Sequence, residues 1–324
     1  MRRALFLAER GCGTTSPNPI VGAVVVSDDD IVVGQGAHRV PGGPHAEVAA
    51  LDAAGAAARG ATLYCTLEPC SHTGRTGPCC ERVVAAGITR VVIATGDPNP
   101  EVNGRGIAYL KDHGVSVEMA GADDARAARE QNAPFLTWIT ARRPHVTLKI
   151  AISSDGFAGY GDRPSKLTGI RTDRFMHRQR AEVGAIAVGS NTILVDDPLL
   201  TARLVFRGSP LTRVIFDRRG RVPDTARVFG TRDSGPVIVT RETIPMELAR
   251  LAERGITSLL VEGGPALHRA FWDSGLVDRV QIIETQVALG DGGVPAFRPP
   301  APADAPQRQI GDDLLIEWDV HRTD

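Results

Sequence analysis

The feature that most constrains the fold of this chain is a regular alternation of short β-branched runs with helical segments. In the first half, apolar runs on either side of Asp28-Asp29-Asp30 predict a hairpin. Strands are expected at 20–26, 31–36, 61–66, 89–94 and 115–119, and helices at 1–10, 46–58, 80–86 and 122–140, the last leading outward. Because strands that alternate with helices usually run parallel, we expect a mostly parallel, helix-covered sheet.

The second half repeats this alternation after Arg142-Arg143-Pro144. Strands are expected at 145–152, 185–188, 213–217, 237–240, 258–261 and 280–285, helices at 173–180, 247–254 and 267–274, and a Pro/Ala-rich surface loop at 295–306. This pattern predicts a second mostly parallel sheet. At roughly 150 residues per domain, the 324 residues divide into two α/β domains, 1–143 and 144–324.

The charge balance excludes several classes of protein. The chain has 37 basic and 38 acidic side chains, and residues 1–143 alone hold 14 basic and 15 acidic ones, so neither half predicts a nucleic-acid-binding surface. No run approaches the roughly 20 apolar residues of a membrane span, and the amino-terminal segment lacks the apolar core of a signal peptide. We therefore expect a cytoplasmic protein that binds neither nucleic acid nor membranes.

A candidate metal site stands in the first half. Five cysteines, an odd number, argue against a disulfide framework and favour metal binding in a reducing compartment. His45 opens the Ala-rich helix, Cys70 follows Glu68-Pro69, and Cys79 comes after eight further residues. One imidazole and two thiolates form a zinc site with an open fourth position. Cys80 is an alternative to Cys79 as the second sulfur ligand.

Glu47 stands two residues after His45, where a carboxylate can reach a metal-bound water without binding the metal. His-x-Glu followed by Pro-Cys and a second Cys is the signature of zinc-dependent deaminases, here with a longer spacer between the cysteines. Taken singly, His45 would be an ordinary helix-end histidine, and the cysteines small buried side chains. Together they predict catalytic zinc, with Glu47 as the general acid and base.

Three segments and a turn carry a specific resemblance: 16–22 (Ser-Pro-Asn-Pro-Ile-Val-Gly), 42–47 (Gly-Gly-Pro-His-Ala-Glu), 66–79 and Asp97-Pro98-Asn99-Pro100. They resemble the deaminase half of the bifunctional riboflavin-biosynthesis deaminase/reductase family. The resemblance implies a cytidine-deaminase-like three-layer domain. It also implies that Asn18 and His72 line the base or ribose pocket and that Arg75 meets the substrate phosphate. Gly77 departs from the family, which commonly has proline there.

Three features of the second half indicate anion binding, each of them weak alone. They are Gly189-Ser190-Asn191-Thr192 after a strand, the charged loop 196–203, and Val261-Glu262-Gly263-Gly264-Pro265 between a strand and a helix. No Gly-x-Gly-x-x-Gly follows a strand, so a dinucleotide site of the standard Rossmann kind is not predicted.

In this order, the three features are similar to the reductase half of the same family, whose fold is dihydrofolate-reductase-like. The resemblance implies substrate contacts at Ser165, Arg180, Leu200, Arg203 and Glu262. It implies contacts with NADPH at Ile152, Leu167, Thr192, Asp196, Gly264, Pro265, Ala266, Leu267, His268, Arg269 and Ala270. Lys149 and Asp155 match other polar positions near the reaction centre. Ser154, Leu167 and the short Gly-rich loop 289–293 depart from the family.

The resemblance implies a bifunctional enzyme with Zn²⁺ and NADPH as cofactors. The first domain would deaminate a phosphoribosylated diaminopyrimidine, and the second would reduce the ribosyl group to ribityl; we also expect a homo-oligomer, a dimer or a tetramer. The departures at Leu167 and Ser154 leave an alternative open, a deaminase with a degenerate reductase-like scaffold. A non-catalytic zinc module is disfavoured because structural zinc normally takes four protein ligands. A nucleic-acid deaminase is disfavoured by the balanced charge.

Overall fold

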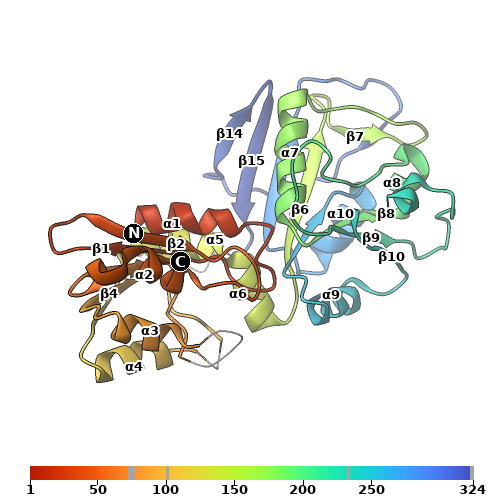
Figure 1. Cartoon of the computed structure of the whole chain (residues 1–324). Coiled ribbons are helices and arrows are strands. Elements are labelled where there is room, and N and C mark those ends of the chain that lie inside the picture. The colour runs from red at the N-terminus through yellow and green to blue at the C-terminus, as the bar shows by residue number, and fades with distance from the viewer. Residues whose placement is uncertain (72–76, 100–101, 232–233, 322–324) are drawn as a thin grey trace. The chain divides into compact units, whose positions relative to one another are not determined.

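The structure of the chain, a computed structural model, describes residues 1–71, 77–99, 102–231 and 234–321. The chain forms two compact units, Met1–Arg142 and Arg143–Asp324, each with its own sheet (Figure 1). Among the helices in the described ranges, none is both long enough and apolar enough to cross a membrane.

The amino-terminal unit is built on a five-stranded sheet in the order β2-β1-β3-β4-β5. The strands are β1 (Gly22–Val26), β2 (Val32–Ala37), β3 (Thr62–Cys65), β4 (Arg90–Ile93) and β5 (Ser116–Met119). β1 pairs antiparallel with both β2 and β3, whereas β3, β4 and β5 run parallel. The expectation of a mostly parallel sheet is therefore wrong for this unit, because the predicted hairpin supplies its first two strands.

Helices cover both faces of this sheet, as the three-layer expectation requires. Ala23 and Val25 of β1 share a core with α2 (Ala46–Ala54), α3 (Cys79–Ala85) and α4 (Arg105–Asp112). Val24 points the other way and packs against α1 (Arg2–Ala8), which also contacts α5 (Ala122–Gln131). Short 3-10 turns follow α1 at Glu9–Gly11 and α2 at Gly55–Ala58.

Two helix expectations in this unit need correction. The single helix expected at 122–140 is divided into α5 and α6 (Ala133–Ala141) at Asn132. The buried Asn132 amide accepts from Ile20 N–H at 2.9 Å and donates to Ile20 C=O at 2.9 Å, so it ties this point of the chain to the start of the sheet. Helix α4 was not expected, because Gly106 lowers its helix propensity. The structure requires that glycine, since a Cβ there would overlap the carbonyl oxygen of Pro69.

The carboxy-terminal unit contains an eight-stranded sheet in the order β10-β9-β8-β11-β6-β12-β15-β14. The first six strands are parallel, which confirms the expectation for this half; they are β10 (Val237–Thr240), β9 (Thr212–Phe216), β8 (Ala185–Gly189), β11 (Ser258–Val261), β6 (His145–Ile152) and β12 (Arg279–Glu284). β15 (Asp313–Asp319) and β14 (Gln307–Ile310) add antiparallel.

Helices again lie on both faces of the sheet. α9 (Ile244–Glu253) and α10 (Pro265–Asp273) cover the main core, whereas α7 (Ile170–Glu182) and α8 (Ser190–Asp196) pack on the other face. β7 (Phe157–Tyr160) and β13 (Gly293–Pro295) form a separate ribbon, and a 3-10 turn spans Arg227–Gly230. The segment 295–306 is not wholly a surface loop, because Phe297 and Ala305 are buried in the core.

Candidate functional site

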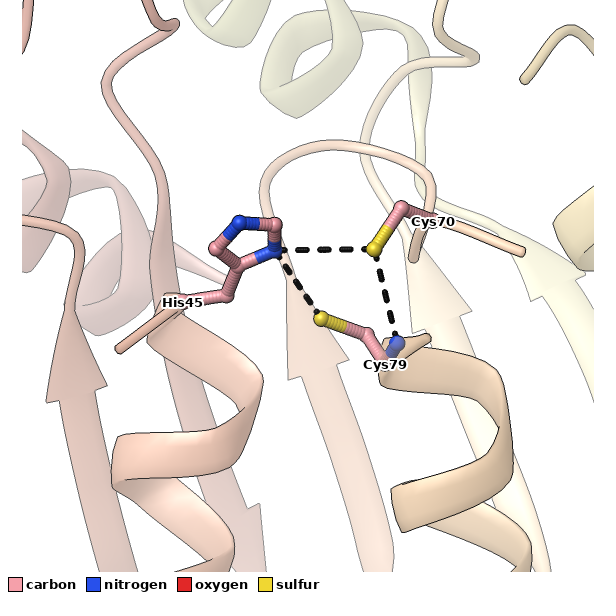
Figure 2. Close-up of side chains that lie close together, drawn as sticks. All are labelled: His45, Cys70 and Cys79. Atoms are coloured by element: carbon pink, nitrogen blue, oxygen red, sulfur yellow. Dashed lines mark hydrogen bonds between the residues drawn. The ribbon is translucent and has the colours of Figure 1, made fainter. Parts of the chain in front are cut away.

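The predicted metal ligands come together in the amino-terminal unit. His45 Nδ1 lies 3.2 Å from Cys79 Sγ and 3.5 Å from Cys70 Sγ, and all three ligand atoms lie within 4.8 Å of one another (Figure 2). One imidazole nitrogen and two sulfurs suit zinc, and three protein ligands leave a fourth tetrahedral position for water. Hydrogen bonding with Cys79 lowers the pKa of the Cys70 thiol to about 4, which favours the thiolate that zinc binds.

Helix starts position two of these ligands. His45 is the N-cap of α2, and Cys79 is the first residue of α3. Helix α2 can lie directly on β2 only because β2 carries Gly34 and Gly36, where a Cβ would overlap the carbonyl oxygens of Ala50 and Ala46. The close approach of this helix to the sheet fixes the position of His45.

Cys80 is not brought into the metal cluster. Its thiol is buried and lies 3.2 Å from the carbonyl oxygen of Pro69 and 3.6 Å from that of Gly106. Helix α3 therefore presents Cys79 to His45 and turns Cys80 toward α4. The structure favours Cys79 over the alternative sulfur ligand.

Glu47 shares a pocket of about 440 Å³ with His45 and Cys70. Its side chain is buried, and burial raises the pKa of the carboxyl to about 7. A carboxyl with a pKa near 7 can both take up and give back a proton at neutral pH. The pocket therefore brings a carboxyl group that can exchange a proton at neutral pH together with two residues of the metal cluster.

Asn18 lines the same pocket and is held by His38, which was not among the predicted site residues. His38 Nδ1 lies 3.0 Å from the carbonyl oxygen of Pro44, and His38 Nε2 lies 3.1 Å from Asn18 Nδ2. Because a carbonyl only accepts, Nδ1 carries the proton, and a neutral ring then accepts from the Asn18 amide at Nε2. His72 and Arg75, also predicted for this site, lie outside the described residues.

Phe135 and Trp138 of α6 also line the pocket. The sequence pattern gave α6 no role, since the segment was expected to lead away from the domain. The division of the helix at Asn132 instead returns α6 to the site. An apolar wall beside polar groups is typical of pockets that bind small molecules.

The buried carboxylate of Glu68 organises the rear of the pocket. Its Oε1 accepts from the amides of Gly106 and Ile107 at 3.0 and 3.2 Å, and its Oε2 accepts from Gly104 and Asp97 at 3.1 and 3.4 Å. Glu68 therefore caps α4 and fixes the start of the Asp97–Asn99 loop, which lines the pocket. It stands two residues before Cys70, so one side chain joins the metal loop to this wall.

We expect the substitution Glu68→Gln to lower the free energy of unfolding by about 2 kcal/mol or more, because an amide NH₂ would replace one acceptor and leave buried N–H groups unpaired. Chemical unfolding would measure the loss, followed by the fluorescence of Trp138 in protein whose other two tryptophans, Trp272 and Trp318, are replaced by phenylalanine. Glu81→Gln, on an exposed face of α3, is the matched control. Equal stability of the two variants would contradict this structural role.

In the carboxy-terminal unit, the structure brings Arg180 and Glu262 together. Arg180 Nε and Nη2 donate to the two carboxylate oxygens of Glu262 at 2.9 and 2.6 Å, and Arg180 Nη1 donates to the carbonyl of Thr201 at 3.2 Å. Arg180 comes from α7, and Glu262 follows β11. The pair stands at the carboxyl edge of the parallel strands, where ligands bind in open α/β sheets.

Lys149 and the neutral side chain of His177 lie near this ion pair, and together these residues form what we call the charged cluster. Burial lowers the pKa of Lys149, and burial with the nearby charges of Arg180 and Arg203 lowers the pKa of His177 to about 4. Burial opposes ionisation of Glu262, but the charges of Arg180 and Lys149 prevail and lower its pKa to about 2. The cluster thus holds Glu262 ionised and His177 neutral at physiological pH.

The remaining residues predicted for substrate lie in this unit as follows. Ser165 is half-buried, and its hydroxyl lies against Gly159. Leu200 is buried with a left-handed φ of 51°, a strained conformation that often marks functional sites. Arg203 is exposed and lines a cavity of about 450 Å³ with Thr201 and Arg207.

The residues predicted to contact NADPH differ in their burial and in their packing partners, so they do not all line one site. Ile152 and Leu167 are buried, Thr192 is half-buried and Asp196 is exposed on α8. Along 264–270, Leu267 packs against Gly263, whereas Arg269 lies over the ring of Phe297 at 4.5 Å. His268 is buried, and Pro265, Ala266 and Ala270 lie on the same helix. Of this run, Gly264 and Pro265 are nearest to the strand ends.

Two glycines at these strand ends fit a phosphate-bearing cofactor. Gly189 is the N-cap of α8 after β8, and Gly264 is the N-cap of α10 after β11. Nothing lies within 4 Å of a Cβ position at Gly264, so the backbone there is open to a ligand. β8 and β11 are neighbours, so the two helix starts lie side by side.

Asp155 forms hydrogen bonds with the Gly-rich loop 289–293 and not with the charged cluster. Its carboxylate accepts from Leu289 N–H at 3.0 Å and from Gly290 N–H at 2.7 Å, and the Tyr160 hydroxyl donates to Leu289 C=O at 2.7 Å. These bonds fix the Gly-rich loop 289–293 beside the β7–β13 ribbon. The shorter loop of this chain is thus well anchored.

Comparisons with known proteins find a different family match in each half of the chain. Residues 1–95 match the family described as the cytidine and deoxycytidylate deaminase zinc-binding region, and residues 144–310 match the RibD C-terminal domain. Fold and sites together define a bifunctional enzyme, a zinc-dependent deaminase joined to an NADPH-dependent reductase. The expected fold class, cytidine-deaminase-like followed by dihydrofolate-reductase-like, is confirmed.

The chain belongs to the RibD family of riboflavin biosynthesis. It is 39% identical to riboflavin biosynthesis protein RibD of Aquifex aeolicus over 90% of this chain and 87% of the relative, and 36% identical to that of Escherichia coli over 98% and 97%. RibD of Acinetobacter baumannii has a similar structure, with a TM-score of 0.86 and 34% identity over 99% of this chain and 98% of that one.

A Thermotoga maritima structure is equally similar, with a TM-score of 0.87 and 33% identity over 98% of this chain and 96% of that chain. It is described as a diaminohydroxyphosphoribosylaminopyrimidine deaminase and 5-amino-6-(5-phosphoribosylamino)uracil reductase. Because the similarity spans nearly the whole of both chains, both halves of such an enzyme are present here.

Proposed function

We propose that this chain deaminates the phosphoribosylated diaminopyrimidine and then reduces the ribosyl group of the product to ribityl. The observation that carries the proposal is that Glu47 lines one pocket with His45 and Cys70, which form a metal-ligand cluster together with Cys79. The activities by which the Thermotoga maritima relative is described support this choice of substrate.

For deamination, His45, Cys70 and Cys79 hold the zinc ion. Zinc in such a site supplies a water molecule that loses a proton near neutral pH. Glu47 takes up that proton at its carboxylate, water oxygen adds to the amino-bearing ring carbon, and the carbon–nitrogen bond breaks. Glu47 then returns the proton to the departing ammonia. Asn18, held by His38, and the wall of Phe135 and Trp138 orient the pyrimidine.

For reduction, the strand ends around Gly189 and Gly264 hold NADPH, which supplies the reducing equivalents. Arg180 is already paired with Glu262, so we propose that it orients that carboxylate. We also keep it as a candidate for binding the substrate phosphate. Arg203, exposed beside the 450 Å³ cavity, is the freer candidate for the phosphate among the predicted arginines. Ser165, Leu200 and Glu262 remain our candidates for the other substrate contacts. Ile152, Leu167, Thr192, Asp196 and Gly264 to Ala270 remain those for NADPH.

The charged cluster at the second site argues against the alternative of a degenerate scaffold. A scaffold has no use for an ionised Glu262 buried between Arg180 and Lys149, because burying these charges costs folding free energy. We also propose a cytoplasmic homo-oligomer that acts on a small molecule without nucleic acid or membrane, in line with its balanced charge.

The decisive experiment is product analysis by mass spectrometry after incubation with the phosphoribosylated diaminopyrimidine. Without NADPH, we expect only the deaminated product; with NADPH, we expect the ribityl product. Prior removal of zinc by a chelator would lower the rate of deamination by about 100-fold or more. The rate of reduction of added deaminated substrate would stay unchanged. Reduction that also disappears with zinc would contradict two independent sites.

A further inference from the structure

Asn132 stands at the junction of α5 and α6, and its side chain pairs with the backbone of the segment before β1. Ile20 lies two residues before β1, outside the register of the sheet. The Asn132 amide accepts from Ile20 N–H and donates to Ile20 C=O, both at 2.9 Å. A carboxamide suits this position because it offers one acceptor and a donor side by side. Only 2% of Asn132 is exposed, so water does not compete for these bonds.

The segment that Asn132 holds forms one wall of the deaminase pocket. Asn18 and Val21, which lie before and after Ile20 in the sequence, both line this pocket. His38 holds the same segment, because its backbone N–H donates to Val21 C=O at 3.0 Å and its ring accepts from the Asn18 amide at 3.1 Å. Two residues from distant parts of the chain, His38 and Asn132, thus fix the position of Asn18.

A second wall of the pocket, helix α6, begins at the same asparagine. Asn132 is the N-cap of α6, and its carbonyl accepts from Leu136 N–H at 2.9 Å in the first turn. Phe135, Trp138 and Ile139 of this helix line the pocket. Among the described residues of the amino-terminal unit, no member of α6 belongs to an apolar core cluster. Packing in the core therefore does little to locate α6, and we expect the hydrogen bonds of Asn132 to do so.

We propose that Asn132 is a positioning residue for deamination, which holds Asn18 and the wall formed by α6 at the spacing that the pyrimidine requires. This rests on the proposed function of the pocket. A displacement of about 1 Å in a group that positions a substrate can cost on the order of 100-fold in rate. Asn132 lies outside α2 and α3, which carry Glu47 and two of the metal ligands, so its effect falls on substrate binding and not on the metal site.

The test is the steady-state kinetics of ammonia release from the phosphoribosylated diaminopyrimidine by the whole protein. For Asn132→Ala, we expect KM to rise by about tenfold and kcat to change by less than about threefold, with zinc still at one ion for each chain. A change that only destabilised the fold would lower the amount of active protein, and hence kcat, but not KM. Thr140→Ala removes an exposed hydrogen bond to Leu136 C=O on the same helix, and as the matched control it keeps the wild-type KM.

Double variants test whether Asn132 acts through the two walls. When Asn18→Ala or Trp138→Ala is already present, the effect of Asn132→Ala on KM should be smaller by about threefold or more, because the group to be positioned is gone. Equal effects in all three backgrounds, or a wild-type KM for Asn132→Ala, would overturn the inference.

A longer amide provides the test if Asn132→Ala does not fold. Asn132→Gln keeps the donor and the acceptor but lengthens the side chain by one methylene, so the walls shift and KM should rise by about threefold. A wild-type KM for this variant would also overturn the inference.

Quenching of Trp138 fluorescence by acrylamide tests the position of α6 without turnover. In protein whose Trp272 and Trp318 are replaced by phenylalanine, Asn132→Ala should raise the quenching constant by about twofold or more, and Thr140→Ala should not. A wild type that releases no ammonia removes the proposed deamination, while the quenching still decides whether Asn132 locates α6. A wild type that deaminates, with an Asn132 variant of unchanged KM and unchanged quenching, removes only the positioning role.

Discussion

Glu47→Gln is expected to lower the rate of ammonia release by about 1,000-fold or more, since it removes the group that moves the proton at both ends of the reaction. The amide of glutamine has nearly the same size as the carboxyl of Glu47, and the side chain at this position is not one of the three predicted metal ligands. Zinc content should therefore stay at one ion for each chain. Ammonia release and metal analysis on the same protein preparation would measure both quantities.

The second active site provides the internal control for this variant. NADPH oxidation with already deaminated substrate should be unchanged, because Glu47 lies wholly within the amino-terminal unit. Asp52→Asn, exposed on the same helix, is the matched substitution and should leave both activities intact. Substantial deamination by the Glu47 variant would show that another group is the proton carrier.

Glu262→Ala should be the most damaging single change in the carboxy-terminal unit. It would leave the guanidinium of Arg180, whose side chain is only 16% exposed, without its carboxylate. An unpaired buried charge costs about 3–5 kcal/mol of unfolding free energy. Reduction should be lost as well, because the anion that faces Lys149 is gone. Calorimetric unfolding together with NADPH oxidation would record both losses.

A double variant separates stability from activity in this site. Replacing both Arg180 and Glu262 by methionine removes the two charges together, so we expect most of the stability to return while reduction stays absent. Arg250→Ala breaks an exposed ion pair with Glu242 and should cost less than about 1 kcal/mol. A double variant as unstable as Glu262→Ala would mean that packing, and not charge, explains the loss.

The sequence predicted the metal cluster because its signals are local. His45 and Cys79 each stand at the start of a helix, and Cys70 follows a strand, so spacing along the chain translates directly into position. The supporting groups could not be found in this way. Glu68 contacts amides 29 to 39 residues away, and His38 acts through Asn18, 20 residues before it. Such contacts depend on how distant segments pack.

In the second unit as well, features with local signals in the sequence were predicted, and features that depend on distant contacts were not. The alternation of strands and helices gave its parallel core, but β14, with the sequence Gln-Arg-Gln-Ile, has no apolar alternation that could indicate a strand. Arg180 and Glu262 were each predicted to contact substrate. That they contact each other follows only from the adjacency of α7 to the end of β11.

The contact between α2 and β2 has a consequence for how this enzyme can change over evolutionary time. His45 and Glu47 keep their positions through Gly34 and Gly36, two residues that have no side chain and no part in the chemistry. Either one could be lost by a single nucleotide change, and the helix would then move away from the sheet with both residues on it. Selection for deamination therefore extends to two positions on a strand that never meets the substrate.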